Sequence, residues 1–279
     1  MNTPFFAAGL ALTAAFCWGT GDFTGGLAAR RSDAFRTVLL SYGVGLVGIV
    51  IAALARGEPF TTLADLGWGA LAGLSGMVGL GALFRGFTIG RMGIVSPVSA
   101  VLGTTLPVLF EAFTKGLPRT QQLFGFGVAL VGIWLLSRPE RLSGRPKGLG
   151  MAVLAGLGFG GFFTFLSQVG PNAVLWPLAA GRLASVTVMA VYALFSQRKM
   201  NLQHSPRGLF FMAGVLDVSG NLFFLLAIQN GRLDVTAVLG SLYPAMTALM
   251  AWVLLKERIT RLQVLGVAAA VLAIVLITV

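Results

Sequence analysis

Two pairs of residues in this chain lie four positions apart and combine a carboxylate with an aromatic or an amide side chain. Trp18 and Asp22 form the first pair, and Asp217 and Asn221 form the second. Residues four apart share one face of a helix. An aromatic ring beside a carboxylate can hold an amine-bearing or planar molecule by stacking and ion pairing. The two pairs therefore predict a binding site for a small molecule, provided that both stretches are helical.

Each carboxylate also has a structural interpretation. Asp22 could instead pair with one of three arginines, Arg30, Arg31 or Arg85. Asp217 could form a bridge to Arg182. Either carboxylate would become a proton site if burial raised its pKa, and protonation would then remove a charge from the site. The sequence leaves these interpretations open.

The remaining candidates lie close to prolines or correspond to Trp18 in the second half of the chain. Pro97, Pro107 and Pro244 remove backbone donors and free carbonyl groups within apolar stretches. Such breaks can contact a substrate, or a neighbouring hydroxyl can satisfy them. The predicted substrate-binding residues are Trp18, Asp22, Phe159, Asp217, Asn221, Ser241 and Tyr243.

The sequence gives little support for a metal site, a cofactor site or an enzyme active site. Cys17 is the single cysteine and His204 the single histidine, so neither a zinc cluster nor a His-based triad can be assembled. Residues 43–48 and 156–161 match the pattern G-x-G-x-x-G, but they lie inside apolar runs and not after a strand, which favours helix packing. We expect no metal, no cofactor, no nucleic-acid partner and no enzymatic activity.

The composition of the chain indicates an integral membrane protein. Hydrophobic residues make up 56% of the sequence, charged residues 10%, and the mean hydropathy is +0.87. Soluble domains carry about 25% charged residues. The net charge of +11 is spread over short connections between apolar runs, a distribution that fits a membrane protein better than a nucleic-acid-binding domain.

The elements that must position the candidate residues are ten apolar runs. A helical span needs about 20 mainly apolar residues, and uninterrupted runs of this length favour helices over a β-barrel. The predicted spans are 5–27, 36–55, 64–86, 92–112, 121–137, 148–168, 173–195, 208–229, 234–255 and 261–279. A charged connection with two prolines, 137–148, divides the chain into two five-span units, 1–140 and 141–279.

The two halves repeat each other at an offset of 141 residues. Gly90-Arg91 corresponds to Gly231-Arg232, and Trp18-Gly19 corresponds to Phe159-Gly160. Because each half holds an odd number of spans, the second half must enter the bilayer upside down. Inverted repeats are typical of transporters that expose a midplane site to either side in turn. The fold class predicted is all-α and polytopic, with two inverted five-helix repeats around a central cavity.

Basic residues predict the orientation of the protein. Fifteen of the 20 Lys and Arg residues fall in the connections after odd-numbered spans. The positive-inside rule places those connections in the cytoplasm and both termini outside. We expect a multi-pass protein of the inner, or plasma, membrane that acts as a monomer in the lipid bilayer.

The last two spans resemble an EamA-type module of the drug/metabolite transporter superfamily. The resemblance rests on residues 238–277. Its marks are Pro244 in mid-helix, the run ALMAWVLLKE that ends at Glu257, and Gln263 and Gly266 at the start of the final helix. Trp18-Gly19 also suits that family, whereas Gly116 stands where the first repeat would match Glu257. The resemblance implies export of small metabolites such as amino acids and similarity to bacterial aromatic-amino-acid exporters. Proton-coupled export of cationic drugs is the alternative, and a channel or an embedded enzyme fits less well.

Overall fold

The computed structural model describes residues 4–90, 92–136, 148–196, 206–255 and 261–278, which lie in helices or in the short connections between them. Helices are the only regular elements in these ranges. In chain order they are α1 (Pro4–Arg31), α2 (Ala34–Arg56), α3 (Leu63–Ile89), α4 (Met92–Lys115), α5 (Thr120–Leu136), α6 (Leu149–Leu166), α7 (Leu175–Phe195), α8 (Arg207–Asn230), α9 (Leu233–Gly240), α10 (Tyr243–Leu255) and α11 (Arg261–Thr278).

The predicted ninth span is divided into two helices. The helix that starts at Leu233 ends at Gly240, and α10 starts again at Tyr243. Pro244 explains the interruption, because proline has no N–H to donate and its ring disfavours helical geometry at the residue before it. Pro97 and Pro107, in contrast, lie within α4, which runs without a break. Of the three prolines, only Pro244 thus coincides with a helix break.

The outer surface of the bundle is apolar, as a lipid-facing surface must be. Five described helices, α2, α3, α6, α7 and α8, contain an 18-residue window apolar enough to cross a membrane. Large side chains such as Phe113, Phe195 and Leu63 are more than four-fifths exposed, at 88%, 86% and 84%. In water such exposure would be costly, whereas in hydrocarbon it satisfies the apolar surroundings. The fold is an all-α polytopic membrane protein.

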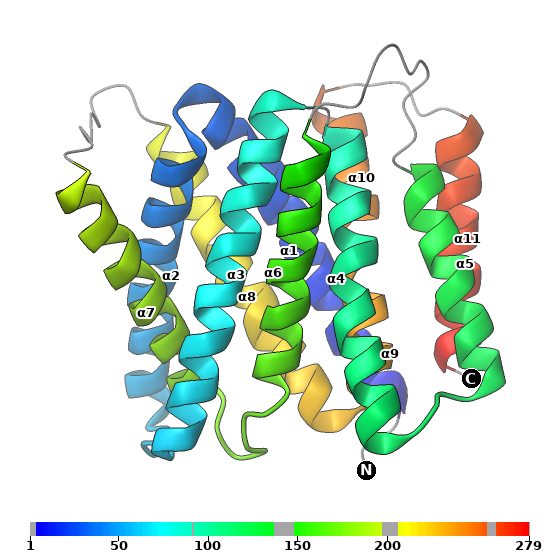
Figure 1. Ribbon diagram of the computed structural model, residues 1–279, viewed down its shortest axis with the longest axis horizontal. Coiled ribbons are helices and arrows are strands. Elements are labelled where there is room, and N and C mark those ends of the chain that lie inside the picture. Colours follow the sequence, from blue (N-terminus) through cyan, green and yellow to red (C-terminus); the bar gives the residue numbers. More distant parts are fainter. Residues whose placement is uncertain (1–3, 91, 137–147, 197–205, 256–260, 279) are drawn as a thin grey trace.

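The two halves run in opposite directions through the bundle. In Figure 1, α1 begins at the lower end, where α11 also ends, and α6 begins at the upper end, where α5 ends. We call the lower end the termini face and the upper end the linker face. Each helix of the second half is antiparallel to its counterpart in the first half, which is the arrangement of an inverted repeat.

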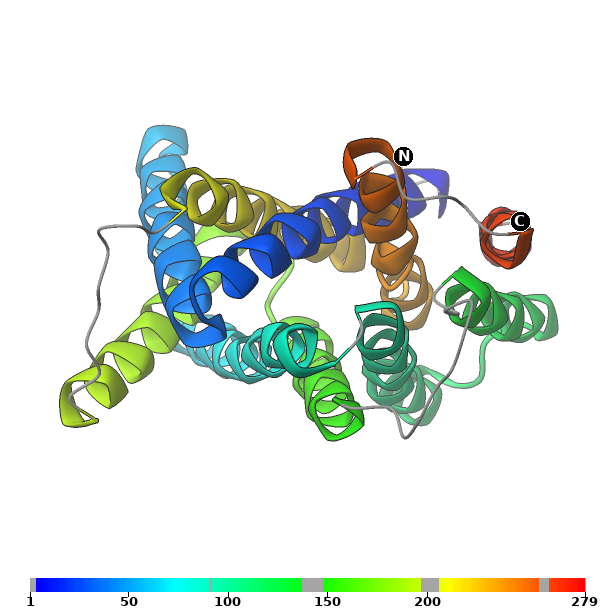
Figure 2. The ribbon, with the colours of Figure 1, turned by 90° about the horizontal axis from the view of Figure 1, so that it is seen from above.

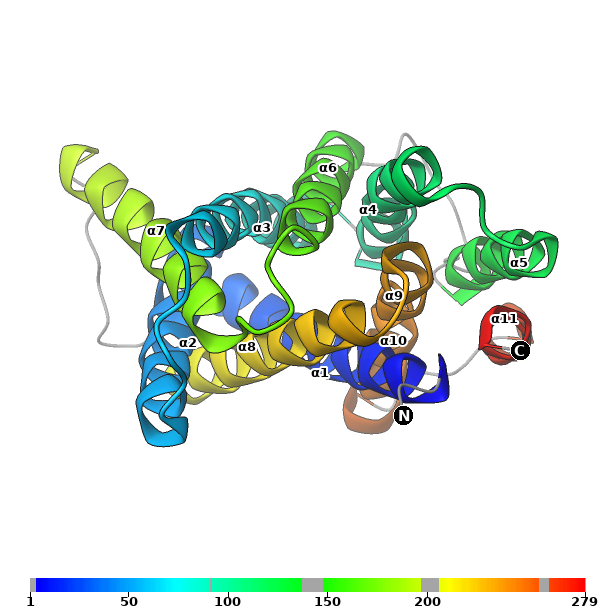
Figure 3. The same cartoon turned by 90° about the horizontal axis from the view of Figure 1, so that it is seen from below.

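Seen along the helices, the bundle has two facing rows of helices, and a further pair of helices stands at each end of the rows. Figure 2 shows α3, α6 and α4 in one row facing α8, α1 and α10 in the other. Figure 3, from the termini face, shows α2 with α7 at one end and α5 with α11 at the other. Because α1 and α6 are counterparts, each row holds helices from both halves, and the interface between the rows crosses the centre of the molecule.

Glycines at equivalent positions let neighbouring helices within each row approach closely, α3 with α6 and α8 with α1. A Cβ on Gly79 would lie 2.8 Å from Cδ1 of Phe159, and a Cβ on Gly220 would lie 2.5 Å from Cδ1 of Trp18. Gly79 and Gly220 are 141 residues apart, and so are Trp18 and Phe159. The same contact between an aromatic side chain and a glycine therefore occurs twice, once on each side of a pseudo-twofold axis. Small residues at such crossings are typical of helix packing in membranes.

Candidate functional site

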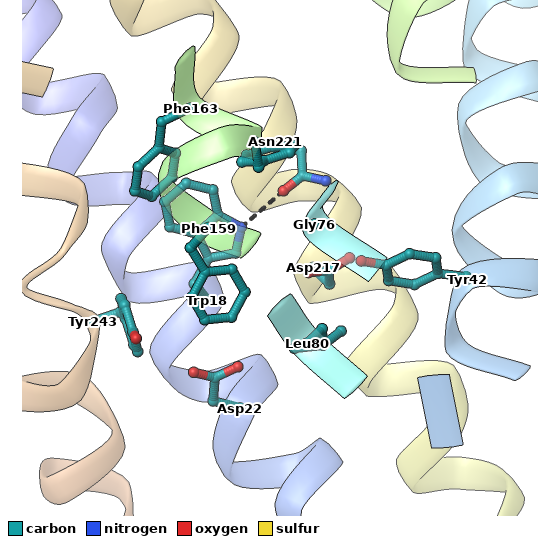
Figure 4. A pocket seen from close by; sticks show the side chains of 11 residues that line it. Trp18, Asp22, Tyr42, Gly76, Leu80, Phe159, Phe163, Asp217, Asn221 and Tyr243 are labelled. Carbon is teal, nitrogen blue, oxygen red and sulfur yellow. Dashed lines mark hydrogen bonds between the residues drawn. The ribbon is translucent and has the colours of Figure 1, made fainter. Parts of the chain in front are cut away.

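A central cavity lies between the two rows of helices (Figure 4). Its lining residues come from six helices and are Trp18, Asp22, Tyr42, Gly76, Leu80, Phe159, Phe162, Phe163, Asp217, Asn221 and Tyr243. The space that water can reach inside it is about 40 Å³. That volume holds about three water molecules. An organic solute would enter only after the helices around the cavity separate.

Trp18 and Asn221 connect the two helices that carry the predicted pairs. The indole Nε1 of Trp18 donates a 2.9 Å hydrogen bond to Oδ1 of Asn221, and both side chains are buried. Phe163 and Phe224 pack against the indole, with ring centroids 5.6 and 5.3 Å away. Together with Phe162, these rings form an aromatic cluster on the side of the cavity nearer the termini face.

Asp22 is buried in the cavity wall, one helical turn from Trp18. Its residue is 7% exposed. Within the described part of the chain, its carboxylate has neither a hydrogen bond nor an ion pair. The bridge to Arg30, Arg31 or Arg85 that the sequence also allowed is not formed, because these arginines are exposed at the linker face. An ionised carboxylate is costly in such a place unless a cation or a proton compensates it.

Asp217 has the partner that the sequence suggested. Arg182, on α7, donates to Oδ2 of Asp217 from a position that is only 4% exposed. The guanidinium also lies 3.9 Å above the centre of the Tyr42 ring. Asp217 thus lines the cavity and is neutralised by a buried arginine at the same time. The bridge that the sequence allowed is formed, and the binding role of Asp217 stays a prediction.

The other predicted residues differ in their relation to the cavity. Phe159 and Tyr243 line it, and the Tyr243 hydroxyl lies 3.1 Å from Oγ of Ser99 on α4. Ser241 is buried in the turn between α9 and α10, outside the cavity lining, and its hydroxyl has no hydrogen-bond partner in the described structure. Tyr243 stands at the helix break, as the position of Pro244 suggested.

Five lining residues escaped the sequence-based prediction: Tyr42, Gly76, Leu80, Phe162 and Phe163. A signal existed for three of them. Phe163, Gly76 and Leu80 are the residues that correspond to Asp22, Asp217 and Asn221 at the offset of 141. Tyr42 carries no such mark, because its counterpart lies on a different surface.

Hydrogen bonds between the two halves join them at the termini face. Oε1 of Glu58 accepts from the backbone N–H groups of Val174 and Leu175, at 3.0 and 2.8 Å, and so caps the start of α7. Oδ1 of Asp65 accepts from the N–H of Gly170 at 2.7 Å. These carboxylates of the first half thus hold the segment between α6 and α7 of the second half.

A second inter-half contact at the termini face involves the α8–α9 connection. The guanidinium of Arg232 donates to the carbonyl of Gly116, at 3.2 Å, and to the buried carboxylate of Asp234. Hydrogen bonding to Asp234 raises the pKa of Arg232 above its usual range, so the arginine stays charged at any physiological pH. This face of the bundle is closed.

The linker face has a crevice, whereas hydrogen bonds join the halves at the termini face. A crevice of about 630 Å³ opens between the linker-face halves of α2, α3, α6 and α7. Phe35, Met77, Met151 and Tyr192 are among its mainly apolar walls, and Arg85 lies on its margin. Helix α3 separates the crevice from the central cavity: Met77 and Gly81 face the crevice, whereas Gly76 and Leu80 face the cavity.

Comparison with known families explains this architecture. The model of the EamA-like transporter family matches the sequence twice, over residues 5–138 and 146–279. The chain belongs to the EamA-like transporter family. It is therefore a membrane transporter of the drug/metabolite transporter superfamily, and its two family modules coincide with the two inverted halves described above.

Solved structures support the fold of the transporter without adding a substrate. A crystal structure described only as that of a protein matches with a TM-score of 0.77 over 98% of each chain, at 18% identity. At that identity the likeness shows the fold alone. No curated protein matches the sequence. The predicted similarity to aromatic-amino-acid exporters thus stays a prediction.

Two further sequence predictions concern a metal site and the residue Glu257. Within the described ranges, no group of three His, Cys, Asp or Glu residues lies close enough to hold a metal ion. His204 and Glu257 lie outside the described residues.

Proposed function

We propose that this transporter is a secondary, alternating-access carrier that exports small metabolites such as amino acids through the central cavity. The observation that carries the proposal is the position of the cavity. It lies between inverted halves, at mid-membrane, and holds a buried carboxylate beside an aromatic wall. A site at the interface of inverted repeats can become accessible from either side when one half rocks against the other.

The different states of the two faces are consistent with one half-cycle of such a carrier. The termini face is closed by hydrogen bonds between the halves, and the linker face has a wide crevice. With the predicted orientation, the linker face is cytoplasmic and both termini are extracytoplasmic. A solute arriving from the cytoplasm would still have to pass α3, which separates the crevice from the central cavity.

A second candidate, proton-coupled export of cationic compounds, is favoured by Asp22. This carboxylate is buried, lines the cavity and has no partner in the described structure. It could therefore bind a proton or a cation in turn. Asp217 is less available for this role, because Arg182 already compensates its charge.

Counterflow in proteoliposomes tests the proposed function. The full chain is reconstituted, and a panel of labelled amino acids and amines is offered against unlabelled solute inside. A carrier gives saturable, trans-stimulated uptake. Unit conductance in a planar bilayer without counterflow would identify a channel, and product turnover in detergent would identify an enzyme; either result would overturn the proposal.

A matched pair of variants links the flux to the cavity. Asn221→Leu introduces the residue that the equivalent position, Leu80, already holds, and it removes the acceptor for Trp18. We expect uptake to fall at least about tenfold, since a polar contact at the site is lost. Asn172→Leu, on the exposed α6–α7 connection, serves as the control and retains the wild-type rate.

A further inference from the structure

The central cavity lies on the pseudo-twofold axis, because its lining contains pairs of equivalent residues. Residues 141 apart occur together in the lining, as Trp18 with Phe159, Asp22 with Phe163, Gly76 with Asp217, and Leu80 with Asn221. A site on the axis meets the same helix surfaces from both halves. Any chemical difference between its two sides therefore comes from differences in the sequences of the repeats.

The two sides of the cavity differ sharply in polarity. In every one of these pairs, the more polar member belongs to α1 or α8, and the apolar member belongs to α3 or α6. The α1–α8 wall presents two carboxylates, an amide and the indole N–H. The α3–α6 wall presents a glycine, a leucine and phenylalanine rings. In Figure 4, Asp22, Asp217 and Asn221 come from one wall and Phe159, Phe163 and Leu80 from the other.

The polar wall holds two carboxyl groups and only one of them has a cationic partner. Asp217 is neutralised by Arg182, which is itself buried against Tyr42 and does not line the central cavity. Asp22 has no such partner in the described chain. The other titratable groups that face Asp22 are the Tyr42 and Tyr243 hydroxyls, and the described faces of α3 and α6 in the cavity bring no charge.

We infer that the cavity selects an amphiphilic monocation, namely a primary or secondary amine attached to an apolar or aromatic body. The ammonium group pairs with Asp22, and the body lies between Phe159 and Phe163. A free carboxylate on the solute is disfavoured, because the cation nearest the cavity, Arg182, already serves Asp217. This inference rests on the proposed carrier function of the same site; for the solute it favours the second candidate, a cationic compound, over an amino acid.

Three ligands that share one ring test the inference. They are 2-phenylethylamine, a cation; phenylalanine, a zwitterion; and 3-phenylpropionate, an anion. Dissociation constants are measured by calorimetry on the purified full chain at pH 7.5. We expect the amine to bind at least about tenfold more tightly than phenylalanine, and the anion more weakly still. The buried Asp22 carboxylate pairs with an ammonium group and disfavours a carboxylate on the ligand. Equal or tighter binding of phenylalanine, or no binding of the amine, would overturn the inference.

Two conservative variants separate the role of Asp22 from general effects. Asp22→Asn keeps the shape of the side chain and removes its charge, so the preference for the amine over phenylalanine should disappear. Asp33→Asn makes the same chemical change at the N-cap of α2, outside the central cavity, where asparagine caps equally well. We expect the control to keep the wild-type preference. An unchanged preference in Asp22→Asn would contradict the assignment.

The pH dependence of binding gives a readout that a purely structural role would not produce. Protons compete with the amine for Asp22, so the wild-type affinity for 2-phenylethylamine should fall as the pH is lowered from 8 to 5. The amine stays charged throughout this range, and the dependence should be lost in Asp22→Asn. Wild-type affinity that is flat with pH would overturn the inference.

Counterflow of the same ligands distinguishes the failure of this inference from that of the proposed function. Counterflow of phenylalanine but not of the amine would leave a carrier with a different solute class. Absence of counterflow for the whole panel of amines and amino acids would remove the carrier function, and the inference would fall with it.

Discussion

Arg182 is a buried cation whose ion-pair partner is Asp217. It is 4% exposed, on a helix that crosses the membrane, and its charge is compensated by Asp217 and by the ring of Tyr42. A buried ion pair contributes little compared with apolar residues of the same size, but the loss of one partner leaves the other charge without compensation. The pair therefore fixes α7 against α8 more strongly than its net energy suggests.

The variant Asp217→Asn should destabilise the transporter by about 3 kcal/mol, at the lower end for a broken buried pair, because asparagine can still accept one hydrogen bond. Unfolding in detergent micelles measures the change. Asp33→Asn retains the cap but loses a partly exposed ion pair with Arg36, so it should stay within about 1 kcal/mol of the wild type. Equal stability of all three proteins would mean that Arg182 has a further partner or is solvated.

At the residue scale, the sequence predicted the polar wall of the cavity better than the apolar wall. Rare polar residues in apolar helices stand out, so Trp18, Asp22, Asp217 and Asn221 could be named from spacing alone. Phe162 and Phe163 could not be singled out, since phenylalanine is common in membrane spans. The absence of a bridge from Asp22 to Arg30, Arg31 or Arg85 also needed coordinates, because an ion pair depends on distances between helices that the sequence does not specify.

At the scale of elements, glycines decide how closely the helices approach. A Cβ on Gly73 of α3 would lie 2.2 Å from the backbone oxygen of Gly181 on α7. Backbone atoms cannot rotate away as a flexible side chain can, so the two helices would have to separate. Gly81, two turns further along α3, has no heavy atom within 4 Å of a Cβ position.

We therefore predict opposite effects for two alanine substitutions in one helix. Gly73→Ala should destabilise the protein by about 1–3 kcal/mol through overpacking. Gly81→Ala should be neutral or stabilising by up to about 1 kcal/mol, since alanine favours the helix. Thermal unfolding in detergent measures both. Equal shifts for the two variants would contradict the close contact between α3 and α7.

The capping of α7 by Glu58 offers a second test at this scale. Glu58→Ala removes the acceptor of two N–H groups at the start of α7. Loss of a cap worth about 1 kcal/mol should speed amide hydrogen exchange of Val174, Leu175 and Trp176 about fivefold. Glu58→Gln keeps an acceptor and should lie between the two proteins. Exchange unchanged from wild type in Glu58→Ala would show that this contact does not hold the termini face.

The helices themselves were largely predictable, and their contacts were not. Apolar runs predicted the spans. Among the described residues, the ninth span is divided before Pro244, one of the three prolines at which the sequence allowed a local break. Contacts such as that of Glu58 with Val174 join residues 116 positions apart and leave no periodic signal in the sequence. The closed termini face therefore became visible only in the structure.

At the scale of the whole molecule, the repeat determines the function more than any single residue does. An offset of 141, read from a few Gly and Arg residues, predicted the inverted halves, and the same offset relates the residues that meet in the cavity. The halves have kept their packing surfaces and diverged in polarity at the axis. A molecule built in this way presents one chemically oriented site between two halves that share their packing surfaces.

Double electron–electron resonance on the reconstituted transporter tests this most directly. With Cys17 replaced by alanine, one label pair, Arg56→Cys and Gln168→Cys, reports on the termini face. A second pair, Arg31→Cys and Ser196→Cys, reports on the linker face. The account predicts that saturating 2-phenylethylamine or phenylalanine, whichever is carried, widens the first distance distribution and narrows the second. Distances that both stay fixed, or that change in the same direction, would contradict alternating access between inverted halves.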